Sequence, residues 1–228
     1  TIREIQEHCN SSGLGSMLDK FPEGAESGVT RLLAAFFFRQ YGQRTSGDST
    51  FVFTHKSFGE YLTSRRIVRA IGRVIRELED KAMSPDDGWD EKEALKYWVQ
   101  ICGPSAITPY LHNFLLNEIK LKPSELLAKW QEKLAKLFSY MLRNGMPMEL
   151  TGIVPFKEAM FQSKNSEEAL LIAVNSCARI TEQVTKLESI NRNAFAAWLR
   201  RIREPRGGLE SDPIGKCLSF LDLSETNL

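Results

Sequence analysis

The chain has 228 residues, of which 42% are hydrophobic, and its formal net charge at pH 7 is +1. These values fit one large globular domain or two small ones. They exclude a strong overall field that would draw the protein to nucleic acid, so any such attraction must come from a local patch. We expect no membrane contact, because no apolar run approaches the roughly 20 residues that span a bilayer and no signal-peptide pattern begins the chain.

The first part of the chain is predicted to hold a short amphipathic helix at residues 1–10, followed by two strands. The runs LLAAFFFRQ (32–40) and FVF (51–53) are apolar, and the turn-rich GQRTSGDS lies between them. Two apolar runs joined by a polar, glycine-containing loop predict a β-hairpin. Together with the helix that follows, this order predicts a winged-helix module over residues 1–83.

A long helix is predicted from about Lys56, because apolar residues recur there at three- and four-residue steps. The stripe consists of Phe58, Tyr61, Leu62, Ile71, Val74, Ile75 and Leu78. The run SPDDG at 84–88 interrupts the pattern, and we expect a module boundary there.

Residues 84–205 are predicted to form a helical arm. Its helices are expected at residues 91–102, 108–119, 123–144, 165–187 and 194–203. Pro123 suits a first helical turn and Gly145 suits the position just past a helix end. Asn165, with Glu168 three residues later, resembles a capping box and predicts a helix start.

The end of the chain is predicted to be a linker and the beginning of a repeat domain. Residues 206–213 are polar and contain two glycines, and leucines then recur at five-residue intervals at 218, 223 and 228. This spacing resembles a pentapeptide-repeat β-helix, although that family usually has a small residue where Leu221 and Thr226 stand. Residues 214–228 are therefore expected to hold the first repeats.

The predicted fold class is mainly α. It comprises a winged-helix module with a small β-hairpin, then a helical bundle or arm, then the start of a right-handed β-helix. The four cysteines, Cys9, Cys102, Cys177 and Cys217, form no C-x-x-C pair. We interpret them as reduced thiols of a cytoplasmic protein, with a long-range disulfide as the alternative. Because the chain begins at Thr1 rather than Met, we expect it to be a fragment of a longer protein.

Residues 51–67 read FVFTHKSFGEYLTSRRI. This order of strand, His-Lys-Ser, aromatic residue and helix resembles the end of the winged-helix module in NACHT-type NTPases, the STAND class of signalling switches. The resemblance extends from Leu32 to Arg66. It implies that His55 senses a nucleotide bound by another part of a larger protein, because an adjacent phosphate favours a charged imidazole.

The resemblance implies a regulatory region that holds an ADP-bound off state and links to a C-terminal sensor repeat domain. The expected partner is the NACHT ATPase core of the same polypeptide, with a homo-oligomer on activation, and bacterial antiviral defence follows from analogy alone. ADP or ATP is expected in the full-length protein and no cofactor in this chain alone. No G-x-x-x-x-G-K-[ST] run occurs, so we predict no catalytic residue and no enzyme activity for this chain.

Four arginines recur at steps of four, four and three, which places them on one face of the long helix. They are Arg65, Arg69, Arg73 and Arg76. They could form a solvated face that acidic residues one turn further on partly neutralise, a contact within an oligomer, or a nucleic-acid contact. The last interpretation makes the chain a winged-helix nucleic-acid-binding protein, which is the main alternative function. No metal site is predicted, because the acidic run from Asp86 to Glu93 lacks calcium-loop spacing.

Overall fold

The computed structural model describes residues 38–43, 49–53, 55–153, 155–187, 192–203 and 213–222. The chain divides into two compact units, Thr1–Gly59 and Glu60–Leu228. The division therefore falls early in the long helix, and the predicted boundary at residues 84–88 lies inside the second unit.

The described part of the first unit is a pair of short strands and the beginning of a helix. Strand β1 (Phe38–Gln43) pairs antiparallel with β2 (Ser49–Phe53). Phe38 lies opposite Phe53, and the register shifts between Gln40 and Gln43. The helix predicted over residues 1–10 lies outside the described residues.

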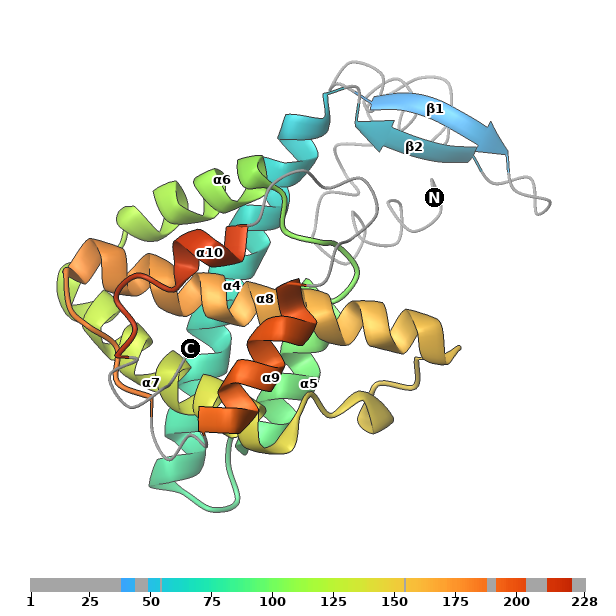
Figure 1. The fold of residues 1–228 in the computed structure, drawn as a ribbon. Helices are drawn as coiled ribbons and strands as arrows, with labels where there is room; N and C mark the ends of the chain where they lie inside the picture. Colours follow the sequence, from blue (N-terminus) through green and yellow to red (C-terminus); the bar gives the residue numbers. More distant parts are fainter. Residues whose placement is uncertain are drawn as a thin grey trace. The chain divides into compact units, whose positions relative to one another are not determined.

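The described part of the second unit consists of helices around one apolar core (Figure 1). Its elements are α4 (Lys56–Met83, which begins in the first unit), α5 (Glu91–Cys102), α6 (Pro109–Lys120), α7 (Ser124–Asn144), η1 (Met148–Leu150), α8 (Phe156–Thr181), α9 (Arg192–Arg203) and α10 (Pro213–Cys217). Helix α8 contacts α5, α6, α7 and α10, and every residue from Asn165 to Ala178 is buried. A helix buried on all sides must be apolar all round or have its polar groups bonded.

Local sequence explains where several helices begin and end. Asp90 accepts a hydrogen bond from the Glu93 N–H at 2.7 Å, and the Glu93 carboxylate accepts the Asp90 N–H at 3.1 Å, so a capping box starts α5. Thr108 caps α6, where Pro109 occupies the first turn. Gly145 follows α7 with φ of 77°, a conformation that glycine adopts without strain.

The predicted fold class is wrong. The described residues of the helical unit form helices and no strand or sheet, so neither a winged-helix hairpin nor a β-helix belongs to it. The apolar stripe of α4 explains the error, because Ile67, Ile71 and Val74 are buried in the same core as α5 and α7. From Glu60 onward, α4 belongs to the helical unit.

The predicted pentapeptide repeats are also wrong where the chain is described. Residues 213–217 form α10, and Cys217 and Leu221 are the buried residues, whereas Leu218 is only half-buried. Leu221 joins Thr185 in a single parallel bridge. A helical turn packed on α8 therefore replaces the first coil of the expected β-helix. Residues 206–212 and 223–228 lie outside the described residues.

Helix α8 begins nine residues before the predicted start at Asn165 and ends at Thr181 rather than at residue 187. Asn165 lies within the helix and is 9% exposed, and its amide donates to the Gly103 carbonyl at 2.6 Å. Gly103 follows the last residue of α5. Asn165 thus satisfies the end of a neighbouring helix instead of its own beginning. No described helix combines the length and apolarity that crossing a bilayer requires.

Candidate functional site at the start of helix α4

His55 lies exposed in the bend between β2 and α4, within the first unit. Its carbonyl accepts a hydrogen bond from the Phe58 N–H at 3.1 Å, which closes the first turn of the helix. Lys56 and Ser57 are exposed in that turn, and the turn has no acidic residue. The positive end of the helix and the basic side chains beside it would therefore favour an anion here.

Gly59 fixes how the strand meets the helix. A Cβ at this position would lie 3.0 Å from Cδ2 of Phe53, so a larger residue would require that ring to shift. The Phe53 ring also packs edge-on against Phe58, with centroids 5.4 Å apart. The sequence FTHKSFG thus sets the path of the chain on both sides of His55.

In the second unit, Glu60, which follows Gly59 in the motif, forms a hydrogen bond to the residue that caps α6. Glu60 is 9% exposed, and its carboxylate accepts a hydrogen bond from the Thr108 hydroxyl at 2.7 Å. The same Thr108 oxygen accepts the Leu111 N–H at 3.1 Å, which caps α6. Glu60, on α4, therefore orients the cap of a different helix.

Two further motif residues strengthen this contact between α4 and α6. The Tyr61 ring packs edge-on against Phe114, with centroids 5.8 Å apart. The Arg65 guanidinium lies 5.9 Å from the Tyr61 centroid, and its Nε is 3.9 Å from the Glu118 carboxylate. The part of the motif after His55 therefore holds α6 against α4.

All four arginines of the predicted stripe are exposed on α4. Arg73 lies 4.9 Å from the ring centroids of both Trp89 and Tyr97, and its Nε is 3.6 Å from Glu77. Arg65 and Arg73 thus already have partners within the chain. No hydrogen bond, ion pair or ring contact joins Arg69 or Arg76 to the residues that the structure describes.

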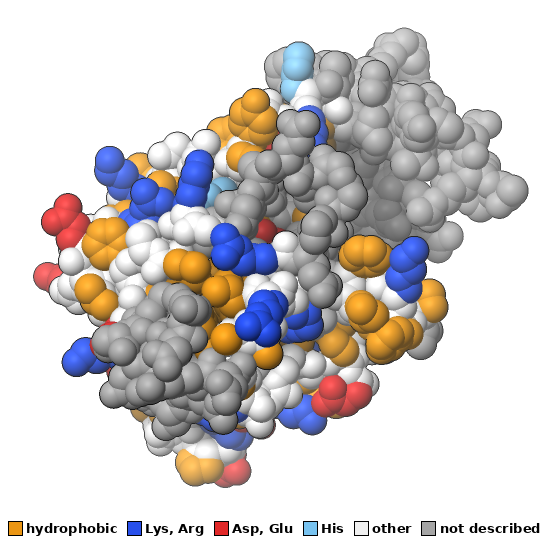
Figure 2. All heavy atoms as spheres, viewed as in Figure 1, with side chains coloured by type: hydrophobic (Ala, Val, Ile, Leu, Met, Phe, Trp, Pro, Cys, Tyr) orange, Lys and Arg blue, Asp and Glu red, His pale blue; other side chains and the backbone are white. Residues whose placement is uncertain are grey.

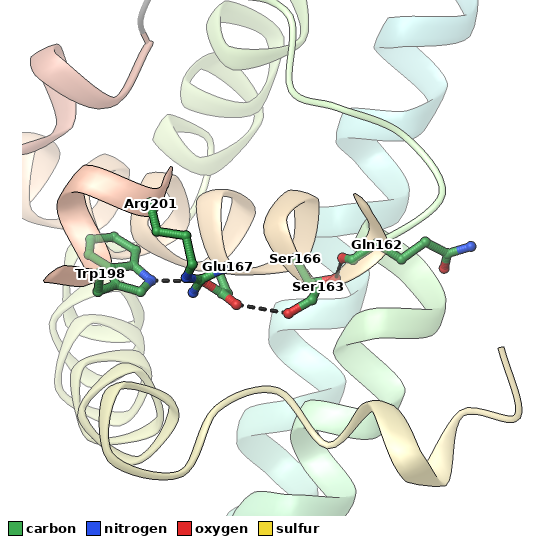
Figure 3. A network of polar contacts seen from close by, with 6 residues as sticks. All are labelled: Gln162, Ser163, Ser166, Glu167, Trp198 and Arg201. Carbon is green, nitrogen blue, oxygen red and sulfur yellow. Dashed lines mark hydrogen bonds and ion pairs between the residues drawn. The ribbon is translucent and has the colours of Figure 1, made fainter. Parts of the chain in front are cut away.

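A buried carboxylate that the sequence analysis did not single out lies between α8 and α9 (Figure 3). Glu167 is 2% exposed and accepts hydrogen bonds from Trp198 Nε1 and from the Ser163 hydroxyl, both at 2.8 Å. Its carboxylate also pairs with the Arg201 guanidinium. These donors satisfy a charge that burial alone would destabilise, so we interpret the group as structural.

A hollow of about 390 Å³ lies between α7 and the segment after α8. Its lining residues are Ala128, Gln131, Glu132, Ala135, Lys136, Gln183, Val184, Thr185 and Lys186. Gln131 donates to the Gln183 carbonyl at 2.9 Å and to the Thr185 hydroxyl at 2.8 Å. Its amide oxygen accepts a hydrogen bond from the Thr181 hydroxyl at 2.6 Å. Gln131 thus holds the segment after α8 against α7, and its amide has few hydrogen bonds left for a ligand.

One face of the surface shows Lys and Arg side chains near α9 and hydrophobic side chains at the N-terminal end of α8 (Figure 2). The exposed apolar residues there are Phe156, Met160 and Phe161. Charges of both signs are spread over this face, so no single-sign field covers it.

Comparison with protein-family models finds no match, and no curated protein or solved structure is significantly similar to the chain. Within the described ranges, no group of three or more His, Cys, Asp or Glu side chains is arranged to hold a metal ion. The function must therefore be argued from the residues themselves.

His112 gives the helical unit a predicted pH dependence. It is buried on α6, and burial, followed by the charges of Arg179 on α8 and Lys216 on α10, lowers its pKa. A lowered pKa means that the unfolded chain binds the proton more readily, so stability falls as the pH drops below about 6.5. We expect the melting temperature to fall between pH 7 and 5.5, and to fall less in His112→Phe. Equal losses in both proteins would contradict this role.

Proposed function

We propose that this chain is the regulatory, nucleotide-sensing region of a signalling NTPase of the NACHT/STAND class. In this proposal His55 contacts the phosphates of ADP, which the ATPase core of the same polypeptide holds. The support is the run FTHKSFGEYL and the place of His55, exposed at a helix start that has basic and no acidic side chains. That exposed position is the observation that carries the proposal.

The contacts that follow His55 suggest how such a signal would travel. Glu60 bonds to Thr108, and Tyr61 packs on Phe114, so the helix that starts beside His55 is fastened to α6. One hydrogen bond to a charged group contributes about 1.5–3 kcal/mol net. Moving a two-state switch from 1:99 to 99:1 needs about 5.5 kcal/mol. The histidine would therefore bias the off state, and packing against the ATPase core would supply the rest.

We also propose a cytoplasmic location. Cys102 and Cys177 are free and buried in the helical unit. Burial raises the pKa of the Cys177 thiol to about 12 and also raises that of Cys102, so both remain protonated and unreactive. Two reduced, buried thiols suit a reducing compartment.

The test is His55→Ala in the intact polypeptide. We expect ADP affinity, measured by titration calorimetry, to fall about 10- to 100-fold, which corresponds to the loss of one charge-assisted hydrogen bond. Basal activity should rise because the off state is weakened. Unchanged ADP affinity together with unchanged basal activity would refute the proposal.

Thr108→Val is a matched second variant, because it removes the hydroxyl that bonds to Glu60 and leaves His55 in place. If the signal passes from α4 to α6, this variant should keep its ADP affinity within about threefold and still raise basal activity. Loss of ADP affinity in Thr108→Val would show that the effect of His55→Ala reflects general weakening of the region.

A further inference from the structure

The exposed face of α4 carries basic residues along most of its length. Acidic residues lie near its C-terminal end and in the turn that follows. Seven residues recur on it at three- and four-residue steps, which places them on one side of the helix. They are Leu62, Arg66, Arg69, Arg73, Arg76, Asp80 and Met83. Asp86 and Asp87 follow, exposed, in the turn after the helix. We call this set the α4 face.

Most charges of the α4 face have no partner among the residues that the structure describes. Arg73 is engaged by Glu77, Trp89 and Tyr97. Among the described residues, no side-chain hydrogen bond or ion pair is found for the other charged members, Arg66, Arg69, Arg76, Asp80, Asp86 and Asp87. Met83, at the acidic end, is 78% exposed, and Leu62, at the basic end, is 39% exposed.

We propose that two copies of this chain associate through the α4 face, with their α4 helices antiparallel. A twofold axis near position 78 places Arg76 of one copy opposite Asp80 of the other. The same axis places Arg69 just beyond the end of the partner's α4, near the turn that holds Asp86 and Asp87. Every pair then forms twice, which is the property of a closed, isologous dimer.

The residue types on the α4 face favour a protein partner over nucleic acid. Acidic side chains share the face with the arginines and would repel a phosphate backbone, whereas they complement the basic half of a second copy. Met83 would cover apolar surface beside Arg73 and its aromatic partners. Arginine and methionine are both enriched at protein interfaces.

The size of the face sets the expected strength. A helical stretch of some 20 residues is about 30 Å long and, with its side chains, about 10 Å wide. The pair would therefore bury on the order of 600–800 Å² in total, below the usual range for stable complexes. The dimer should accordingly be weak, in the micromolar range, and strongly dependent on salt.

The test is sedimentation velocity of the 228-residue chain at about 100 μM in 50 mM and 500 mM NaCl. We expect a dimer at low salt, with a dissociation constant at least tenfold higher at high salt. The double variants Arg69→Glu/Arg76→Glu and Asp80→Arg/Asp87→Arg should each be monomeric. Mixed in equal amounts they should form a heterodimer, because at each changed position an acidic side chain of one variant then faces a basic side chain of the other.

Two controls show whether the α4 face itself forms the dimer. Arg200→Glu removes an exposed arginine on α9 and should leave the dimer unchanged. Circular dichroism should show that every variant keeps its helix content, since the changed side chains are exposed or half-buried. A monomer at low salt, a dimer that survives both double variants, or a mixture that stays monomeric would overturn the proposal. So would binding of a DNA duplex that Arg69→Glu/Arg76→Glu abolishes.

This inference does not depend on nucleotide sensing. It concerns the middle and the end of α4, and no nucleotide is added in the experiment. The charge-swap mixture can therefore succeed or fail whatever the result for His55→Ala.

Discussion

Replacing Trp98 with alanine is expected to lower the free energy of unfolding by about 3–5 kcal/mol. Trp98 lies on α5, is 0% exposed, and donates from its indole Nε1 to the Ser166 carbonyl of α8 at 2.9 Å. The change leaves a large cavity at the contact between α5 and α8 and removes a buried hydrogen bond, and both losses add. Urea unfolding followed by circular dichroism measures the effect.

Two other tryptophan changes separate the two losses. Trp98→Phe keeps most of the ring volume but removes the donor, so we expect a smaller cost of about 1–3 kcal/mol. Trp89 is a matched control, because it is only half-buried, outside the helices, and contacts Arg73 and Tyr97. Trp89→Ala should cost less than Trp98→Ala. If the two alanine variants were equally stable, Trp98 could not be an anchor of the core.

The helices between residues 91 and 144 could be predicted from the sequence. Helices are predicted at residues 91–102, 108–119 and 123–144. The structure has them at Glu91–Cys102, Pro109–Lys120 and Ser124–Asn144. All three carry local signals: an apolar stripe in each, a proline in or just before the first turn of α6 and α7, and a glycine after the end of α5 and α7. Such signals act over a few residues, so they can be interpreted without knowing the fold.

The wrong predictions depended on what a segment packs against. The Asn165 pattern matched a capping box, yet tertiary packing placed that side chain on the end of α5. The five-residue leucine spacing at the end of the chain resembled a repeat, but a repeat needs stacked neighbours to supply its core. Residues 213–222 pack on helix α8 instead. The Asn175 amide of α8 also donates a hydrogen bond to the Ser219 carbonyl at 2.5 Å.

The residues of the candidate site also differ in whether local sequence could predict them. The prediction that His55 lies at a strand–helix junction needed only local pattern, and the structure places it in the bend between β2 and α4. Its role as a nucleotide sensor stays a prediction. The partner of Glu60, by contrast, is 48 residues away, and that of Glu167 is 31 residues away. No local pattern identifies such pairs, because only the folded arrangement of helices brings them together.

The second large effect is expected at Glu167. Glu167→Ala should lower the free energy of unfolding by about 3 kcal/mol, because it leaves the buried indole N–H of Trp198 without its acceptor and removes a buried ion pair. Arg201→Ala should cost less. The Arg201 side chain is 49% exposed and can be solvated, while Glu167 would retain its bonds from Trp198 and Ser163.

A double-mutant cycle between Glu167→Ala and Arg201→Ala measures how strongly the two groups depend on each other. We expect a coupling of about 1–2 kcal/mol, above the value typical of exposed pairs, because the carboxylate is removed from water. Glu149→Ala is the control: it breaks the exposed contact between Glu149 and Lys92, whose atoms are 2.9 Å apart, and should change stability little. If Glu167→Ala changed the free energy of unfolding as little as this control, the carboxylate would have to be hydrated in the folded protein. Its charge would then not hold α9 against α8.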